Sequence, residues 1–575
     1  MNKLRKMIKV AKGEEKAELV LKNAKVVNVF TNEIITGDVA IYKGEIVGIG
    51  EYSGINEIDI KGMYVAPGFI DSHVHIESSK VTPPQFARAV VPRGVTTVIA
   101  DPHEIANVKG VEGIKYMLKS SENIPLDVFI VLPSCVPATP FENSGAILDA
   151  EDLEELIDSD RILGLGEMMD YVGVLHQSEK VLEKLYMTRL KGKIIDGHGP
   201  MISGKELNAY VVSGIATEHE CSTTKEVLER LRLGMYIQVR EGTVAKNLKE
   251  ILKIANKNNL RRLLFCTDDK EIYDLMESGS IDNNIRLAIK EGVDPIDAIK
   301  MATLNAAEAY NLRKRGAVAP GYKADLVIID DLENLNIVKV FKNGRLVAEN
   351  YKPLFEVPYY DDVNMKNTVN IGDITKEDLK IRIHGENVHV IKIIPNSLIT
   401  EKSVKKVGKD IITRNGEFIS GDDIVKMAVI ERHKKSGNIG VGLVEGFGLK
   451  NGAIASTVAH DSHNLIVIGD SDEDMLLAIE ELKRVGGGIT LTSGREILGT
   501  LPLEIGGLMT DRNIEKVYEH LNRLLKIAYD KLKINPDIEP FMALSFMALP
   551  VIPKLRITDM GLFDVERFEF INIFS

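Results

Sequence analysis

The nine residues from Pro67 to His75, PGFIDSHVH, constrain the fold of this chain more than any other stretch. The apolar run that leads into them predicts a buried strand, and His73 and His75 stand at its carboxyl end. Side chains two positions apart on a strand point the same way, so both imidazoles face one place. Imidazole is the commonest nitrogen ligand of zinc and related ions, so the motif predicts a metal site. The alternative that the motif alone leaves open is a pair of surface histidines.

Composition narrows the class of protein. A chain of 575 residues is too long for one hydrophobic core, so several domains are expected. Contents of 44% hydrophobic and 27% charged residues are those of a globular protein, and a net charge of -12 argues against a nucleic-acid partner. The three cysteines form no C-x-x-C pair, so we expect neither a disulfide framework nor a cysteine zinc site.

The sequence gives no sign of a membrane segment or a signal peptide. The charged stretch Met1 to Lys16 lacks the apolar core of a signal peptide, and no run of about 18 apolar residues is present. Together with the scattered cysteines, this predicts a cytoplasmic location.

Two stretches of short predicted strands bracket the middle of the chain. Residues 18–66 alternate strands with turns such as Lys43-Gly44, and residues 324–348 do the same around Asn343-Gly344, a strong hairpin signal. We therefore expect a discontinuous small β-sandwich domain, formed by residues 1–66 and 313–365, whose halves meet in space.

Between these stretches, residues 67–312 alternate strand and helix patterns, which predicts an α/β fold with a (β/α)8 TIM-like barrel. Such barrels carry their chemistry at the carboxyl ends of the strands. Six side chains that can bind metal follow predicted strands: His73, His75, Glu167, His198, His219 and Asp268. Each one alone fits a structural role, but six at one face of a barrel suffice for a two-metal site with Glu167 as the bridging carboxylate.

The order of these residues resembles the amidohydrolase superfamily, including its β domain split around the barrel. Many two-metal members carry a carbamylated lysine at the fourth strand, where this chain has Glu167 in the sequence GLGE. This glutamate, the stretch ADPHEIAN at residues 100–107 and AHDSHN at residues 459–464 are similar to the adenine deaminase family of bacteria and archaea. The resemblance spans the chain from residue 18 onward and implies hydrolytic deamination of adenine to hypoxanthine and ammonia, in purine salvage. The P-C-x-x-C signature of the cysteine-zinc base deaminases is absent.

The resemblance also implies two divalent metal ions, with Mn²⁺ or Fe²⁺ favoured and Zn²⁺ compatible with the same donors. One ion would lie between His73, His75 and Asp268, the other between His198 and His219, with Glu167 between the two. A water activated by the ions attacks C6 of adenine, and Asp268 takes its proton and later passes it on.

Further roles are expected around this centre. The resemblance assigns catalytic roles to Asp268, Glu220 and His219, and the acid that protonates the purine ring stays open among Glu220, Glu104 and His103. Asp196 and Glu220 are candidates for orienting the ligand imidazoles. Polar stretches after the predicted strands and at residues 459–464 offer further candidates for substrate contacts, which are His103, Glu104, Arg240, His460, Asp461 and Ser462.

Residues 366–575 predict an extra C-terminal α+β domain after an irregular linker. The triple glycine at 486–488 lacks the phosphate-loop pattern and predicts a turn. Residues 459–464 follow an apolar stretch, so we expect them on a loop that covers the barrel mouth and contacts the purine. The alternative is a self-contained interaction or oligomerisation domain.

Two other functions remain open from the sequence. One is a cyclic-amide hydrolase of the same superfamily, similar to dihydroorotase, and the other is a non-catalytic scaffold. The expected partners are a small-molecule substrate and a second copy of the chain in a homo-oligomer, a dimer, with no nucleic acid and no membrane.

Overall fold

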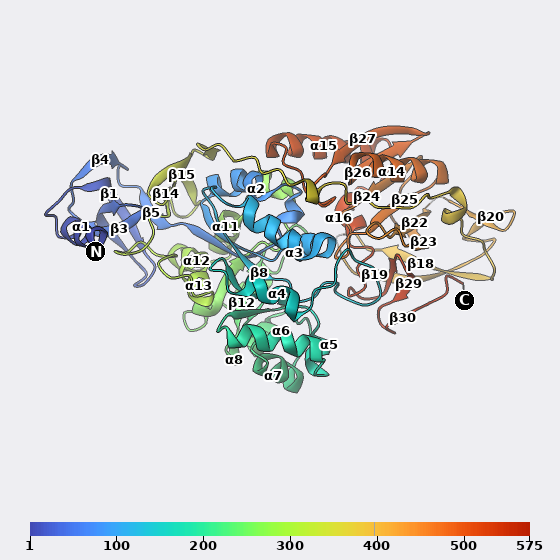
Figure 1. Ribbon diagram of the computed structural model, residues 1–575, viewed down its shortest axis with the longest axis horizontal. Helices are drawn as coiled ribbons and strands as arrows, with labels where there is room; N and C mark the ends of the chain where they lie inside the picture. The colour runs from blue at the N-terminus through green and yellow to red at the C-terminus, as the bar shows by residue number, and fades with distance from the viewer. Residues whose placement is uncertain (396, 422, 575) are drawn as a thin grey trace.

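The computed structural model describes residues 1–395, 397–421 and 423–574. Figure 1 shows an elongated molecule with the N-terminal strands at one end, alternating strands and helices in the centre, and the C-terminal elements at the other end. Within the described part of the chain, no helix combines the length and the apolar character needed to cross a membrane.

Strands from both sides of the middle segment form one nine-stranded sheet. Its order is β17-β16-β15-β14-β5-β1-β2-β3, with β4 paired to β1. The strands are β1 (Ala17–Asn28), β2 (Glu33–Tyr42), β3 (Glu45–Gly50), β4 (Gly54–Asp59), β5 (Tyr64–Pro67), β14 (Leu326–Asp331), β15 (Asn336–Lys342), β16 (Arg345–Glu349) and β17 (Lys352–Pro353), and helix α1 (Asn2–Ala11) precedes them. The halves join where β5 runs antiparallel to β14, with Ala66 opposite Val327.

The period of two along these strands gives the sheet two buried faces. On β5, Val65 belongs to the core of this β unit, whereas Ala66 belongs to the large core of the central region. Val39 of β2 and Phe341 of β15 share the first core although three strands separate them in the sheet. The sheet therefore curls over a common core.

Eight parallel strands follow, in a five-stranded sheet of order β10-β9-β8-β7-β6 and a three-stranded sheet of order β11-β12-β13. They are β6 (Phe69–Val74), β7 (Val95–Ala100), β8 (Asp127–Leu132), β9 (Ile162–Met168), β10 (Ile194–Gly197), β11 (Thr217–Glu218), β12 (Tyr236–Arg240) and β13 (Leu263–Cys266). The helices between and after them are α2 (Pro83–Val90), α3 (His103–Ser120), α4 (Ala150–Ile157), α5 (Tyr171–Leu175), α6 (Glu179–Leu190), α7 (Gly204–Val212), α8 (Thr224–Arg232), α9 (Leu248–Leu252), α10 (Ile272–Glu277), α11 (Ile281–Lys290), α12 (Pro295–Met301) and α13 (Leu304–Ala309). Amphipathic patterns place them: α11 buries Ile281, Ile285 and Ala288 and packs against β6 and β13.

The two parallel sheets adjoin at both of their edges. Beside β6, the amide of Asp268 donates to the carbonyl of His73 at 3.0 Å, and beside β10 the amide of Ala216 donates to the carbonyl of Ile195 at 2.9 Å. This curled parallel arrangement brings the carboxyl ends of strands from both sheets together.

One strand begins later than the sequence predicts. The sequence Gly214-Ile215-Ala216 before the polar Thr217 to Glu220 predicts a strand at residues 214–216, but β11 covers Thr217–Glu218. Gly214 has a φ of +111° and its amide donates to the carbonyl of Val211, so this residue closes the end of α7. Pairing starts only where Thr217 lies opposite Tyr236 of β12.

The C-terminal region contains an eight-stranded sheet of order β19-β18-β23-β22-β25-β24-β26-β27. Its strands are β18 (Asn387–Ile393), β19 (Thr400–Lys406), β22 (Ile424–Ile430), β23 (Ile439–Glu445), β24 (Ala453–Ser456), β25 (Leu465–Gly469), β26 (Gly488–Ser493) and β27 (Glu496–Pro502), and the other elements are α14 (Asp472–Val485), α15 (Ile514–Asp530), α16 (Pro540–Ser545), β20 (Ile412–Arg414), β21 (Glu417–Ile419), β28 (Leu555–Thr558), β29 (Gly561–Asp564) and β30 (Glu569–Phe570). Helix α14 begins after Ser471, whose side chain accepts an amide, and ends at Gly486, which has a φ of +83°. The triple glycine is therefore the connection from α14 to β26.

This C-terminal region packs directly on the central strands and helices (Figure 1). The amide of Thr82 donates to the carbonyl of Thr510 at 3.1 Å, and the amide of Thr510 donates to the carbonyl of Lys80 at 3.0 Å. One apolar core contains residues of both regions. The loop after β24, which carries residues 459–464, is consequently held beside the ends of the central strands.

Candidate metal centre

The carboxyl ends of five parallel strands hold a cluster of imidazoles and carboxylates. Its members are His73 and His75 at the end of β6, Glu167 in β9, His198 after β10, His219 after β11 and Asp268 after β13. His198 is partly exposed and the others are buried.

Glu167 lies at the centre of this cluster. Its Oε1 is 3.5 Å from His75 Nε2, whereas its Oε2 is 2.7 Å from His198 Nδ1 and 3.0 Å from His219 Nε2. Asp268 Oδ1 lies 3.0 Å from His75 Nε2. The two oxygens of Glu167 thus face different imidazoles, which is the geometry that a bridging carboxylate needs.

The donor set fits divalent cations. His73, His75 and Asp268 bring one ligand atom each within 4.8 Å of one another, and so do His73, Glu167 and His219. Imidazole nitrogen with carboxylate oxygen suits zinc, manganese and iron alike.

The carboxylates of the cluster favour protonated imidazoles. Burial lowers the pKa of His198, but the Glu220 and Glu167 carboxylates outweigh it and raise that pKa to about 9. Burial raises the pKa of Glu167, yet the His198 and His219 imidazoles hold it well below its usual range. Metal ligands must be deprotonated, so dications would replace these protons.

Arg240, at the end of β12, links two carboxylates. Its Nη1 donates to Asp268 Oδ2 at 2.6 Å and to Glu220 Oε1, and its Nη2 donates to Glu220 Oε2 at 3.1 Å. Burial raises the pKa of Glu220, but Arg240 and His198 lower it to about 2. Glu220 is therefore an ionised carboxylate near neutral pH and a poor proton donor.

Asp101, which follows β7, orients two members of the cluster. Its Oδ2 accepts the amide of Glu167 at 3.1 Å, and its carbonyl accepts Nδ1–H of His75 at 2.9 Å, which leaves Nε2 of His75 free to face the cluster. Gly166 allows this approach, since a Cβ there would lie 2.0 Å from Asp101 Oδ2.

The residues after Asp101 link the cluster to the C-terminal region. His103 Nδ1 is 3.3 Å from Glu167 Oε1. Glu104 accepts hydrogen bonds from His460 Nδ1 at 2.5 Å and from His463 Nε2. Positions more than 350 residues apart in sequence therefore meet at the edge of the cluster.

Glu104, His460 and His463 are close enough to hold an ion, but the tautomer of His463 opposes this use. Its Nδ1 accepts the amide of Ala459 at 3.1 Å, so its Nε2 carries the proton that is donated to Glu104. A protonated nitrogen has no lone pair for a cation. The triad is therefore a hydrogen-bonded link between the two regions.

Asp461 and Ser462 complete this side of the site. Asp461 Oδ1 is 4.0 Å from His103 Nε2, and both Asp461 and Ser462 are buried. The carbonyl of Ser462 accepts Nε2–H of His433 at 2.8 Å. All the residues that the sequence singled out therefore lie in or beside one region, at the ends of the central strands.

Three neighbouring residues carry no sequence motif that could have identified them. Tyr310, after α13, donates to Asp196 at 2.8 Å beneath His73. Arg432 is fully buried and donates to backbone carbonyls that include that of His463. Glu142 is buried in the loop between β8 and α4.

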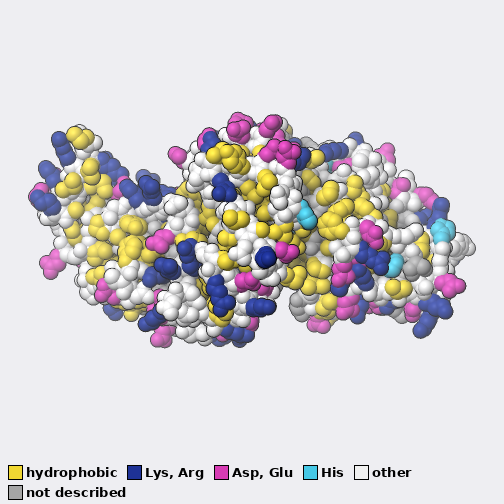
Figure 2. Space-filling view, turned by 90° about the horizontal axis from the view of Figure 1, so that it is seen from below, with side chains coloured by type: hydrophobic (Ala, Val, Ile, Leu, Met, Phe, Trp, Pro, Cys, Tyr) yellow, Lys and Arg dark blue, Asp and Glu magenta, His cyan; other side chains and the backbone are white. Residues whose placement is uncertain are grey.

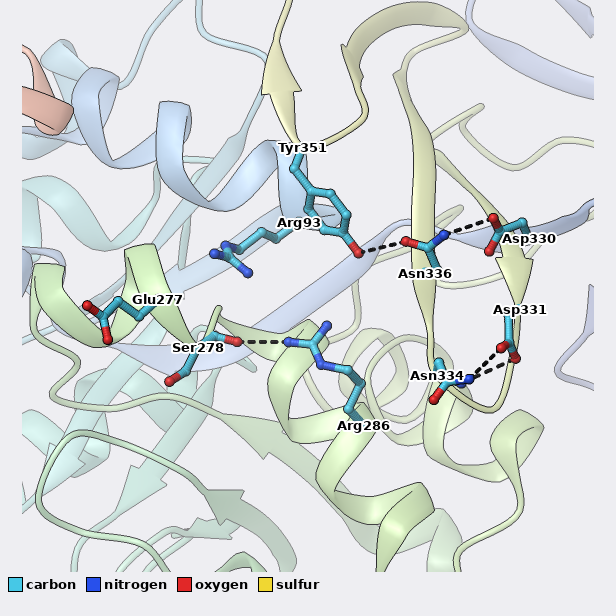
Figure 3. A pocket seen from close by; sticks show the side chains of 9 residues that line it. All are labelled: Arg93, Glu277, Ser278, Arg286, Asp330, Asp331, Asn334, Asn336 and Tyr351. Carbon is cyan, nitrogen blue, oxygen red and sulfur yellow. Dashed lines mark hydrogen bonds between the residues drawn. The ribbon is translucent and has the colours of Figure 1, made fainter.

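A separate hollow of about 660 Å³ lies at the amino end of the strands (Figure 3). Arg93, which lines it, lies two residues before the start of β7 and so at the opposite end of that strand from Asp101. The polar side chains that line this hollow pair with their neighbours: Arg286 donates to the carbonyl of Ser278 at 2.8 Å, and Asn336 donates to Asp330 at 2.8 Å. This hollow is not part of the cluster.

Charged side chains of both signs lie on the surface. Figure 2 shows Lys and Arg side chains interspersed with Asp and Glu over one face of the molecule, around patches of hydrophobic side chains.

Comparison with known proteins covers the whole chain. The Amidohydrolase family model matches residues 64–347, and the Adenine deaminase C-terminal domain model matches residues 397–569. Adenine deaminase of Clostridium acetobutylicum is 53% identical over 567 residues, covering 98% of this chain and 99% of its own. Adenine deaminase 2 of Carboxydothermus hydrogenoformans is 49% identical over 575 residues, covering all of both chains, and adenine deaminase of Nitratidesulfovibrio vulgaris is 48% identical over 570 residues, covering 99% of each. The chain has the amidohydrolase fold and belongs to the adenine deaminase family.

Proposed function

We propose that this chain hydrolyses adenine to hypoxanthine and ammonia with two divalent metal ions. The observation that carries the proposal is the position of Glu167 between two sets of imidazoles, in a chain whose full-length relatives are adenine deaminases. These relatives do not favour the cyclic-amide hydrolase, and a set of six ligand-type side chains, five of them buried, does not favour a scaffold.

His73, His75 and Asp268 would hold one ion, His198 and His219 the other, and Glu167 would contact both. When bound, the ions supply a water that loses its proton near neutral pH. Mn²⁺ or Fe²⁺ is our proposal for the native metal, and Zn²⁺ suits the same donors.

Asp268 is placed to move protons. Its Oδ1 faces His75, and Arg240 fixes its Oδ2, so the carboxylate has one orientation toward the cluster. Asp268 would accept one proton of the attacking water, whose oxygen forms a bond to C6 of adenine. The bond from C6 to the amino nitrogen then breaks, and ammonia leaves with the proton that Asp268 delivers. The remaining hydroxyl proton returns to the acid that protonated the ring nitrogen, which leaves the carbonyl of hypoxanthine. His219 lies beside Glu167 and assists as a ligand.

His103 is our candidate for the acid that protonates the ring nitrogen next to C6. Burial lowers its pKa, but Glu104 and Asp101 outweigh burial and raise it well above the usual range. Its imidazole lies between Glu167 and Asp461, at the boundary of the cluster and the C-terminal loop. Glu220 is ionised through Arg240 and orients Asp268 and the imidazoles. His460, Asp461 and Ser462 would cover the base and exclude water.

Ultraviolet spectra of the metal-loaded protein with adenine, adenosine and dihydroorotate test this function. Conversion of adenine, with about two ions per chain by metal analysis, supports the proposal. Conversion of dihydroorotate alone, or a metal-free protein without turnover after metal addition, would refute it.

We also propose how the strands close and how the chain divides into domains. We propose that the eight parallel strands close into a (β/α)8 barrel over residues 67–312. Residues 1–66 and 313–365 would then form the β domain and residues 366–575 the C-terminal domain. We propose that the protein is a homodimer in the cytoplasm. Ultracentrifugation of the purified protein tests whether it is a dimer.

A further inference from the structure

We propose that Glu142, together with Asp461, recognises the edge of the purine that carries N3 and N9–H, and so selects the free base over its nucleoside. This inference rests on the proposed function and names a substrate-selecting residue for it.

Glu142 is positioned by contacts between the central strands and the C-terminal region. Its neighbour Asn143 donates from its amide to Asp559 Oδ1 at 3.0 Å and from its side chain to Asp559 Oδ2 at 2.6 Å. The carbonyl of Asn143 accepts the side-chain amide of Asn464 at 2.8 Å. Asp559 and Asn464 both belong to the C-terminal region, so these hydrogen bonds hold the loop after β8 against residues 459–464.

The carboxyl groups of Glu142 and Asp461 are buried with unused hydrogen-bonding capacity. Glu142 is 6% exposed and Asp461 is 4% exposed. Glu142 Oε1 and Asp461 Oδ2 have no hydrogen-bond partner among the residues that the structure describes. Buried polar atoms without partners are costly, and such atoms at a functional site are explained by a ligand that pairs with them.

The two carboxyl groups offer both a donor and acceptors. Burial and the nearby Asp461 carboxylate raise the pKa of Glu142 well above its usual range, and burial raises that of Asp461 to about 6. Two buried carboxyls whose negative charges repel each other disfavour double ionisation, which favours the protonated form of Glu142. A protonated carboxyl donates from its O–H and accepts at its other oxygen, which matches the acceptor N3 and the donor N9–H, the two ring nitrogens bonded to C4 of adenine.

The position of these groups agrees with this edge of the base. Asp461 is separated from Glu167 by the imidazole of His103, which lies within 4.0 Å of both carboxylates. A base whose C6 faces Glu167 directs its opposite edge, N3 and N9, away from the metal ligands. A ribosyl group on N9 removes the N9–H donor and would clash with the buried side chains that face this edge of the base.

Three variants test the proposal: Glu142→Ala, Glu142→Gln and, as a matched control on the following helix, the exposed Glu154→Ala. Adenine, 9-methyladenine and 3-deazaadenine are the substrates, and equilibrium binding of hypoxanthine with metal content is measured beside kcat/KM. Glu142→Ala should lower kcat/KM for adenine and the affinity for hypoxanthine about 10- to 100-fold at unchanged metal content. Glu142→Gln keeps one donor and one acceptor and should lose less than about tenfold.

The analogues separate recognition from folding. Wild type should discriminate against 9-methyladenine and 3-deazaadenine, and Glu142→Ala should discriminate less. Unchanged adenine kinetics and unchanged discrimination in Glu142→Ala would overturn the inference, and so would a Glu142→Gln loss as large as that of alanine in a folded, metal-loaded protein. Wild-type protein that does not deaminate adenine at all would instead refute the proposed function.

Discussion

Replacing Glu167 by Gln is the most direct test of the proposed two-metal centre. Gln keeps the size of the side chain but removes a charge that lies 2.7 Å from His198 Nδ1, 3.0 Å from His219 Nε2 and 3.5 Å from His75 Nε2. At an effective dielectric constant of about 20, two unit charges about 3 Å apart interact by about 5 kcal/mol. That energy corresponds to about 10³- to 10⁴-fold in binding.

We therefore expect Glu167→Gln to lose at least one of two ions on dialysis and to lose adenine turnover by about the same factor. Metal content per chain and the ultraviolet change on adenine hydrolysis measure the two effects. Glu206→Gln, on the exposed side of α7, serves as the control and should retain both. Full metal occupancy with wild-type turnover in Glu167→Gln would refute the bridging role.

Three other perturbations have defined outcomes. Asp268→Asn should keep at least one ion while turnover falls by about 10² to 10⁴, measured with adenine, and a loss below about tenfold would assign the proton acceptor elsewhere. Glu539 has its pKa raised to about 7 by burial and by Glu271, so the folded state holds a proton that the unfolded state releases near pH 4.5. Stability to urea should consequently fall as pH rises between these values, and the fall should be smaller in Glu539→Gln; equal profiles would contradict the assignment. Alanine at His460, Asp461 and Ser462 together should lower kcat/KM for adenine while metal content stays, and unchanged kcat/KM would reject the covering loop.

Local rules account for the residues at the strand ends. The spacing of His73 and His75 follows the period of two of a strand, and the other ligand-type residues each follow an apolar run. The carboxyl ends of parallel strands lie at the same edge of a sheet. The closeness of these ligand-type side chains could therefore be predicted without knowledge of any long-range contact. The displaced start of β11 shows the limit of this approach, because Gly214 ends a helix before the strand begins.

Contacts between distant segments could not be predicted in this way. Arg240 joins Glu220 to Asp268, and His463 donates to Glu104 from a position 359 residues later. Which loop faces which depends on how the C-terminal region packs, and no local pattern encodes that packing. Glu142 lies in a loop without periodicity, and only its burial beside Asp461 identifies it.

The proposed metal ligands and the proposed substrate contacts lie in different parts of the fold. The proposed metal ligands all lie at the carboxyl ends of the central parallel strands, whereas His460, Asp461 and Ser462 lie on a loop of the C-terminal region. Adenine is small and offers few polar groups, so a strand-end site alone would leave much of it in water. The loop is held by Glu104 on one side and by the buried Arg432 on the other. Substitutions in the loop should therefore alter which base is accepted before they alter metal content, and substitutions at the strand ends should do the reverse.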